Sequence, residues 1–182
     1  MYNISMSKDK KRVKSIYAKN MLARKIILPF TTIGGNLNKI LKQQLEEDLY
    51  GKCCKDGYIK TDSIQISSYS SGVVCENDVM FDVLFECLIC HPVEGQNIKC
   101  KVENITRAGI RAVYFKEKVS PITIFVARDH HYDSKYFSTV KEEDIISIKV
   151  IGIRYELNDE TISVLGELKQ PKHKNSKIKL TK

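Results

Sequence analysis

The sequence predicts an α+β protein with two parts, a small antiparallel sheet covered by one helix and then a closed five-stranded barrel. Apolar side chains recur at helical spacing in residues 37–49. Residues 79–105 alternate apolar and polar side chains on both sides of a proline, as two half-buried strands do. Residues 96–168 hold five extended segments. One early helix followed by a run of strands is typical of α+β proteins.

The net charge of +8 over 182 residues is concentrated at the two ends of the chain. Residues 1–25 contain eight basic side chains and one acidic one, and residues 169–182 contain six lysines and no acid. The residues between them carry more acids than bases. We therefore expect two solvated basic tails, 1–20 and 169–182, with contact to phosphates or to an acidic partner as the alternative.

Apolar runs in the chain are short, as in residues 26–28 and 83–85. A membrane-spanning helix needs about 20 consecutive apolar residues. The basic residues near the start are followed by no apolar block, so the pattern of a signal peptide is missing. The expectation is a soluble, intracellular protein.

The first part begins with an expected strand over 21–32 that is broken at Pro29. Asn36 is a good helix cap, and the helix over 37–49 ends at Gly51. Residues 52–60 and 63–71 read as short extended pieces. The strongest strand pattern follows, with every second residue apolar at Phe81, Val83, Phe85, Cys87 and Ile89.

A corner at His91-Pro92 and a turn at Glu94-Gly95 separate this strand from the second part. The five extended segments expected there are 96–103, 109–116, 122–128, 144–156 and 161–168. Residues 129–143, between the third and fourth segments, could hold a short helical turn. Five strands with a longer excursion after the third suit a Greek-key barrel of the OB class, a fold that commonly binds single-stranded nucleic acid.

Two groups of side chains, the cysteines and a histidine pair, suggest a metal site or a catalytic site, but neither suggestion is supported by the surrounding sequence. Cys87 and Cys90 have C-x-x-C spacing, but a strand turns them to opposite faces, and the adjacent Cys53 and Cys54 cannot supply the second pair of a zinc site. Asp129-His130-His131 is the one cluster worth testing for catalysis, and no accompanying motif supports an enzyme. We expect free thiols packed in a core, no metal, no other cofactor and no catalytic residue.

Four segments in one order give the chain its resemblance to a known family: LEEDLYGKCCKDGYI (45–59), FDVLFECLICHPVEGQNIKCKV (81–102), TIFVARDHH (123–131) and IISIKVIGIRYELNDETISVLGEL (145–168). The chain resembles the larger stalk subunit of archaeal and eukaryotic multisubunit RNA polymerases, the seventh subunit of RNA polymerase II. That resemblance implies an arm over 1–20, a polymerase-docking tip domain over 21–92, an S1-type OB barrel over 93–168 and a tail over 169–182.

The resemblance also implies roles for individual residues. Core-polymerase docking would involve Leu49, Gly51, Cys53, Gly57, Tyr58 and Ile59. RNA contacts would involve Arg107, Arg111, Tyr114, Lys116, Lys118, Phe125 and Arg128. Pro92 and Gly95 would form the domain junction and set the direction of the barrel. The implied partners are the large and other core polymerase subunits, nascent RNA and a smaller stalk subunit, with no membrane.

Two further points bear on this resemblance. Ile110 stands where S1-type domains usually place a stacking ring, which predicts weak and largely electrostatic RNA binding. A free-standing S1-type RNA-binding adaptor in translation or RNA decay is the alternative, although such an adaptor needs no tip domain. The chain would be non-catalytic by itself. It would lie with the polymerase in the nucleus, or in the host cytoplasm and virion if its source is a large DNA virus.

Overall fold

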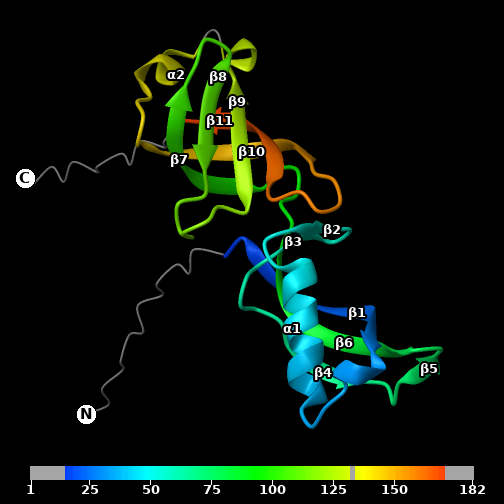
Figure 1. Cartoon of the computed structure of the whole chain (residues 1–182). Helices are drawn as coiled ribbons and strands as arrows, with labels where there is room; N and C mark the ends of the chain where they lie inside the picture. The colour runs from blue at the N-terminus through cyan, green and yellow to red at the C-terminus, as the bar shows by residue number, and fades with distance from the viewer. Residues whose placement is uncertain (1–14, 132–133, 171–182) are drawn as a thin grey trace, which may run out of the picture.

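A computed structural model describes residues 15–131 and 134–170 of the chain. It has two parts, an N-terminal sheet covered by the helix α1 and a closed barrel (Figure 1). The predicted fold class is therefore confirmed. Most of the predicted basic tails, residues 1–14 and 171–182, lies outside the described residues.

The N-terminal sheet is built around the strand β6, Asp78–Cys90. One edge of β6 pairs along its whole length with β1, Tyr17–Pro29. Its other edge pairs in turn with β3 (Gly57–Ile59), β4 (Gln65–Tyr69) and β5 (Val73–Cys75), and β2 (Cys53–Cys54) lies beyond β3. The strongest strand pattern in the sequence is thus the centre of the sheet.

The first strand starts earlier than its sequence pattern indicated. Residues 17–20, which we expected in the arm, pair with residues 87–90 of β6. Ala18, Lys19 and Asn20 are exposed, so the burial that produces an alternating pattern is absent here. At its other end β1 stops at Pro29, and a single 3-10 turn, η1 (Phe30–Thr32), leads toward the helix.

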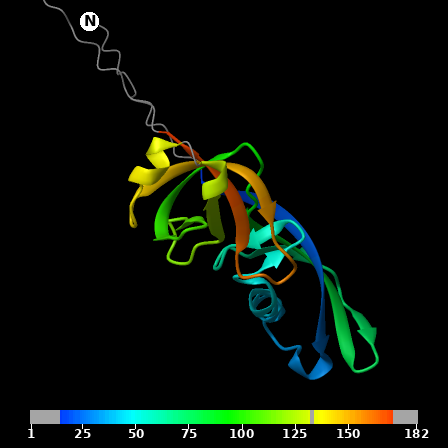
Figure 2. The ribbon, with the colours of Figure 1, turned by 90° about the horizontal axis from the view of Figure 1, so that it is seen from above.

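The helix α1 runs from Leu37 to Leu49, as predicted. The Asn36 side chain accepts a hydrogen bond from the Lys39 N–H at 3.2 Å, which satisfies one of the unpaired donors at the helix start. Leu41 and Leu45 are buried in one apolar cluster with Phe85 and Ile89 of β6. Figure 2 shows α1 end-on beside the long strands β1 (blue) and β6 (green). The helix therefore covers one face of the sheet.

The alternation of β6 sorts its side chains as predicted. Its apolar residues of odd number are buried under α1, including Cys87. Cys90 lies on the other face, in a second cluster that contains the barrel interior. The two cysteines of the C-x-x-C sequence are thus on opposite sides of the sheet.

The barrel consists of β7 (Asn97–Ile105), β8 (Gly109–Val113), β9 (Ile122–Ala127), β10 (Ile145–Arg154) and β11 (Ile162–Lys169). Its order around the ring is β7-β8-β9-β11-β10, and β10 closes on β7. Only β9 and β11 are parallel. This is the strand order of a five-stranded Greek-key barrel of the OB class. The expected helical turn is present as η2 (Arg128–His130) and α2 (Lys135–Thr139).

One histidine of the pair that follows β9 has a structural role. His130 is exposed, whereas His131 is buried and connects two strands of the barrel. Its Nε2 accepts the Leu168 N–H at 2.8 Å, so the ring proton lies on Nδ1, which donates to the Ala127 carbonyl at 2.9 Å. The ring also stacks on Phe137, with ring centroids 5.5 Å apart. Both ring nitrogens are engaged with the backbone.

All six cysteines are free, and Cys75 is the exposed one. We expect a thiol reagent such as dithiobis(nitrobenzoate) to modify one thiol rapidly in the native protein and six in urea, because a buried thiol cannot reach the reagent. Cys75→Ser should abolish the rapid reaction. Rapid reaction of a second thiol in the native protein would contradict this burial.

Candidate functional site

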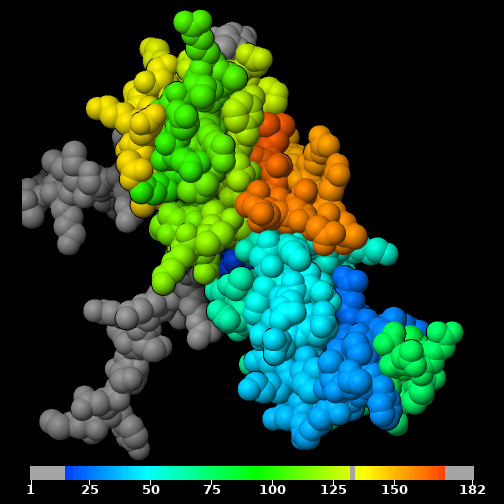
Figure 3. All heavy atoms as spheres, in the orientation of Figure 1, coloured from blue at the N-terminus to red at the C-terminus, as the bar shows by residue number. Residues whose placement is uncertain are grey.

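The N-terminal sheet and the barrel share a buried seam. Cys53, Tyr58 and Cys90, on the face of the sheet away from α1, belong to the same apolar cluster as the barrel interior. The backbone of Cys53 also pairs with the β10–β11 turn: its N–H donates to the Asp159 carbonyl at 2.8 Å, and its carbonyl accepts the Asn158 N–H at 2.9 Å. Figure 3 shows this turn (orange) packed against the first part (cyan).

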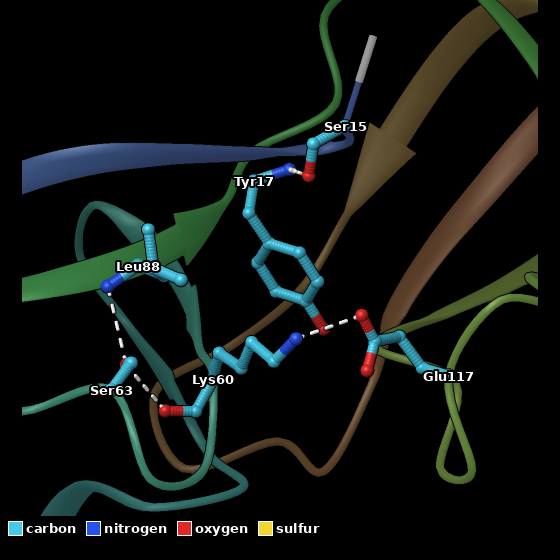
Figure 4. A network of polar contacts seen from close by, with 6 residues as sticks. All are labelled: Ser15, Tyr17, Lys60, Ser63, Leu88 and Glu117. Carbon is cyan, nitrogen blue, oxygen red and sulfur yellow. Dashed lines mark hydrogen bonds and ion pairs between the residues drawn. The ribbon is translucent and has the colours of Figure 1, made fainter. Parts of the chain in front are cut away.

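Polar contacts extend the seam at its edge. Lys60 Nζ lies 2.8 Å from Glu117 Oε1 of the β8–β9 loop and 4.9 Å from the centre of the Tyr17 ring (Figure 4). Burial, with the nearby Glu117 carboxylate, raises the pKa of Tyr17 above its usual range, so the phenol stays protonated. One lysine thus joins β1, the β3–β4 connection and the barrel.

The chain crosses the seam at the predicted corner. Pro92 is buried, and Gly95 has φ +81°, a left-handed conformation that glycine adopts without a steric cost. The Gly95 N–H donates to the Val150 carbonyl at 2.8 Å. Beside the corner, the Tyr155 hydroxyl donates to the Lys55 carbonyl at 3.1 Å and lies 3.4 Å from His91 Nδ1. The corner is therefore one of several connections between the N-terminal sheet and the barrel. The contacts along the seam also fix the orientation of the barrel.

The residues predicted to dock on a polymerase lie at and around the β2–β3 hairpin. Leu49 and Gly51 are half-buried at the end of α1, whereas Cys53, Gly57, Tyr58 and Ile59 are buried. Cys53 and Tyr58 belong to the cluster at the seam and Ile59 to the cluster under α1, so these four residues offer no outer surface. The hairpin exposes Lys55 and Asp56 instead, two residues that we did not predict to dock.

Gly57 shows why this hairpin needs a glycine. Its φ is +127°, and a Cβ there would lie 2.4 Å from the Cys90 carbonyl oxygen. Real Cβ atoms do not approach oxygen so closely, so any side chain would push β3 away from β6.

The residues predicted to contact RNA fall into separate places. Arg107, Arg111, Phe125 and Arg128 belong to the β7–β8 loop, β8, β9 and its end. Lys116 and Lys118 belong to the β8–β9 loop and line a hollow of about 1070 Å³ beside the N-terminal sheet. Tyr114 is only 6% exposed, packed in the shared cluster. Its ring is therefore part of the core and is not presented to solvent.

The outer surface of β8, β9, β11 and β10 brings several of these residues together. Arg111 and Phe125 are register partners, and Phe125 is next to Leu165. Phe125 is 38% exposed and borders a shallow apolar hollow of about 360 Å³ that also includes Ile153 and Arg154. We call Arg111, Phe125, Arg154 and Leu165 the outer barrel face. Arg154 and Leu165 were missed. Leu165 lies between the buried Val164 and Gly166, so its alternation could have shown that it points outward, whereas a bulge between Val150 and Gly152 reverses the alternation of β10 before Arg154.

Ile110 is completely buried inside the barrel. Since residue 110 points inward, an aromatic ring there would not face a ligand on the outer barrel face. The ring that this face does offer comes from β9, at Phe125. The expected weakness that we drew from Ile110 therefore does not apply to this surface.

Arg128 is held by the protein itself. Its Nε donates to the Arg107 carbonyl at 2.9 Å, its Nη2 donates to the Thr106 carbonyl at 3.3 Å, and its guanidinium lies over the Phe137 ring. Arg128 thus stabilises the β7–β8 loop. Arg111 is more accessible, with one ion pair to Glu103 at 3.0 Å.

The described residues contain neither a metal-binding cluster nor a helix that could cross a membrane. Within 15–131 and 134–170, no group of three or more histidine, cysteine or acidic side chains could hold a metal ion. In the same part of the chain, no helix combines the length and the apolar composition needed to cross a membrane.

Comparison with known proteins gives one informative similarity. No family model matches the chain. It is similar to a protein of Acanthamoeba polyphaga mimivirus named as a putative DNA-directed RNA polymerase subunit. The two are 25% identical over 171 residues, which cover 85% of this chain and 83% of the mimivirus protein. The similarity thus spans both the N-terminal sheet and the barrel, and it supports a role in DNA-directed RNA polymerase.

Proposed function

We propose that this chain is a non-catalytic stalk subunit of a multisubunit DNA-directed RNA polymerase. The observation that carries the proposal is the similarity to the mimivirus protein, which covers most of both chains. The order of an α+β sheet and an OB-type barrel agrees with the stalk subunit that the sequence motifs resemble. The proposed partners are the large and other core subunits, and a smaller stalk subunit where the polymerase has one. The chain would lie with the polymerase in the nucleus, or in the host cytoplasm and the virion.

In this proposal the N-terminal sheet docks on the core enzyme through the β2–β3 hairpin. Lys55 and Asp56 are exposed at its end, and the predicted docking residues Gly57 and Tyr58 hold the hairpin on the sheet and the barrel. The buried seam then fixes the barrel relative to the docked sheet. A rigid seam suits a stalk, whose barrel must keep one direction.

The test is purification of the tagged full chain from source cells that contain the polymerase. We expect the large polymerase subunits to co-purify. The double variant Lys55→Glu, Asp56→Lys should reduce their recovery, because it reverses both exposed charges of the hairpin without altering a buried side chain. Glu142→Lys, an exposed change on the barrel, is the matched control. Recovery with RNA and without any polymerase subunit would favour the adaptor alternative.

We also propose that the outer barrel face contacts nascent RNA. Phe125 offers an exposed ring, and Arg111 and Arg154 offer positive charge on the same surface. Aromatic rings bind single-stranded nucleic acid by stacking on bases, while arginine binds the phosphates. Such contacts would not depend on the RNA sequence. A subunit that meets every transcript needs this kind of binding.

Phe125→Ala is expected to weaken binding of single-stranded RNA by about 1–3 kcal/mol, the usual contribution of one stacked base. Fluorescence anisotropy with a labelled RNA at fixed salt measures it. Phe115→Ala is the matched control, because Phe115 is equally exposed, at 37%, but is in the β8–β9 loop. Unchanged RNA affinity of Phe125→Ala would mean that RNA does not use the outer barrel face.

A further inference from the structure

The outer edge of β1 is the longest open strand edge in the described structure. The strand has 13 residues and pairs with β6 in one continuous register, with no bulge. Within residues 15–131 and 134–170, no other strand pairs with it. Natural proteins usually shorten, twist or cover such edges, because an open edge accepts another strand. An unbulged edge of this length is therefore a candidate for binding an extended segment.

Hydrogen bonds on the far side of β6 show which groups of β1 point outward. Leu88 and Asp82 direct their backbone away from β1: their carbonyls accept the N–H of Lys60 at 2.9 Å and of Ser70 at 3.0 Å. Their own N–H groups donate to Ser63 Oγ and Ser70 Oγ. Backbone direction alternates along a strand. The odd-numbered residues of β6 must therefore bond to β1.

The pairing register between β6 and β1 shows which residues of β1 bond to β6. Val83 and Phe85 of β6 are opposite Arg24 and Leu22, so the even-numbered residues of β1 bond to β6. The odd-numbered residues Lys19, Met21, Ala23, Lys25 and Ile27 then direct both N–H and C=O outward. Tyr17, the next odd residue, agrees, since its N–H donates to Ser15 Oγ at 3.1 Å.

The side chains along this edge define the strand that would fit it. Between Tyr17 and Pro29 the charged residues are Lys19, Arg24 and Lys25, and there is no acid. Met21 and Ile27 are 55% and 60% exposed. Basic side chains on an edge repel a second basic strand, which disfavours a second copy of β1 and the basic residues 1–14. Lys19 is already paired with Glu86 of β6. Arg24 and Lys25 are adjacent and point to opposite faces, so they attract a strand that carries an acidic residue on each face.

We propose that β1 binds an extended acidic segment of a partner protein by strand addition. The partner strand pairs with the outward groups of residues 19–27. Two adjacent acidic residues of that strand lie beside Arg24 on one face and Lys25 on the other, and apolar residues on the Lys25 face pack on Met21 and Ile27. Main-chain pairing supplies affinity in such complexes, and alternate side chains supply specificity. The inference does not depend on the proposed polymerase role.

The test uses the ¹⁵N-labelled full chain and a short soluble peptide in which two adjacent glutamates are flanked by valines. We expect saturable shifts of the amide signals of Met21, Ala23 and Lys25, and slower hydrogen exchange at these amides. A peptide with lysine in place of glutamate should bind at least tenfold more weakly. The double variant Arg24→Glu, Lys25→Glu should reverse this preference.

Proline at Ala23 separates strand addition from a purely electrostatic contact. Ala23→Pro removes one outward N–H and leaves the β1–β6 ladder intact, so peptide affinity should fall at least tenfold while the unfolding transition is retained. Ala23→Ser is the matched control and should bind as the original chain does. Equal binding by Ala23→Pro, no saturable shift with either peptide, or a dimer in sedimentation that pairs through β1 would each overturn the proposal.

Discussion

Phe85→Ala is expected to lower the free energy of unfolding by about 3–5 kcal/mol, as deletion of a large buried aromatic side chain usually does. Phe85 is completely buried at the centre of β6. Its ring belongs to the cluster that joins the sheet to Leu41 and Leu45 of α1. The substitution loses both the burial of the ring and the packing around the cavity that it leaves.

Leu84→Ala tests whether position, rather than residue size, causes the loss. Leu84 precedes Phe85 on the same strand but lies half-buried on the face away from α1. We expect a loss of about 1 kcal/mol or less there, since most of the destabilisation in cores comes from fully enclosed groups. Urea denaturation followed by circular dichroism measures both variants. If Leu84→Ala and Phe85→Ala lost similar amounts of stability, α1 would not pack on the face of the sheet that carries Phe85.

Stability is expected to fall steeply as the pH rises above about 9. Burial raises the pKa of the Cys90 and Cys100 thiols to about 12, and the neighbouring Cys53 adds to the shift at Cys90. A thiol in the unfolded chain ionises near pH 9, so above that pH the unfolded state has released protons that the folded state still holds. Stability is therefore complete below pH 9 and decreases up to about pH 12. Each such thiol contributes at most about 1.4 kcal/mol per pH unit.

The urea midpoint measured on both sides of pH 9 gives this slope directly. The double variant Cys90→Ala, Cys100→Ala should show a smaller slope above pH 9, although it is less stable at neutral pH. Ile124→Val is the control, because it removes core volume without removing a thiol. A slope in the double variant as steep as in the original chain would assign the alkaline loss to other groups, such as Tyr58 and Tyr114, whose pKa values burial also raises.

The periodic parts of the sequence were enough to predict most of the fold. The helix over 37–49 has a strong apolar stripe and an asparagine cap, and β6 alternates over its whole length, because in both elements one face is buried. The five barrel strands alternate for the same reason. The start of β1 is exposed, so residues 17–20 carry no such signal and their pairing came only from the structure.

The placement of functional side chains depended on contacts between distant residues. Tyr114 and Tyr58 look like accessible rings in the sequence, but the seam between sheet and barrel buries both. Ile110 is inside the barrel and Phe125 outside, a difference set by the register of β8 and β9. Local sequence predicts which residues alternate along a strand. Only the folding of the strands into a sheet and a barrel decides which of those faces meets solvent and which meets the other part of the protein.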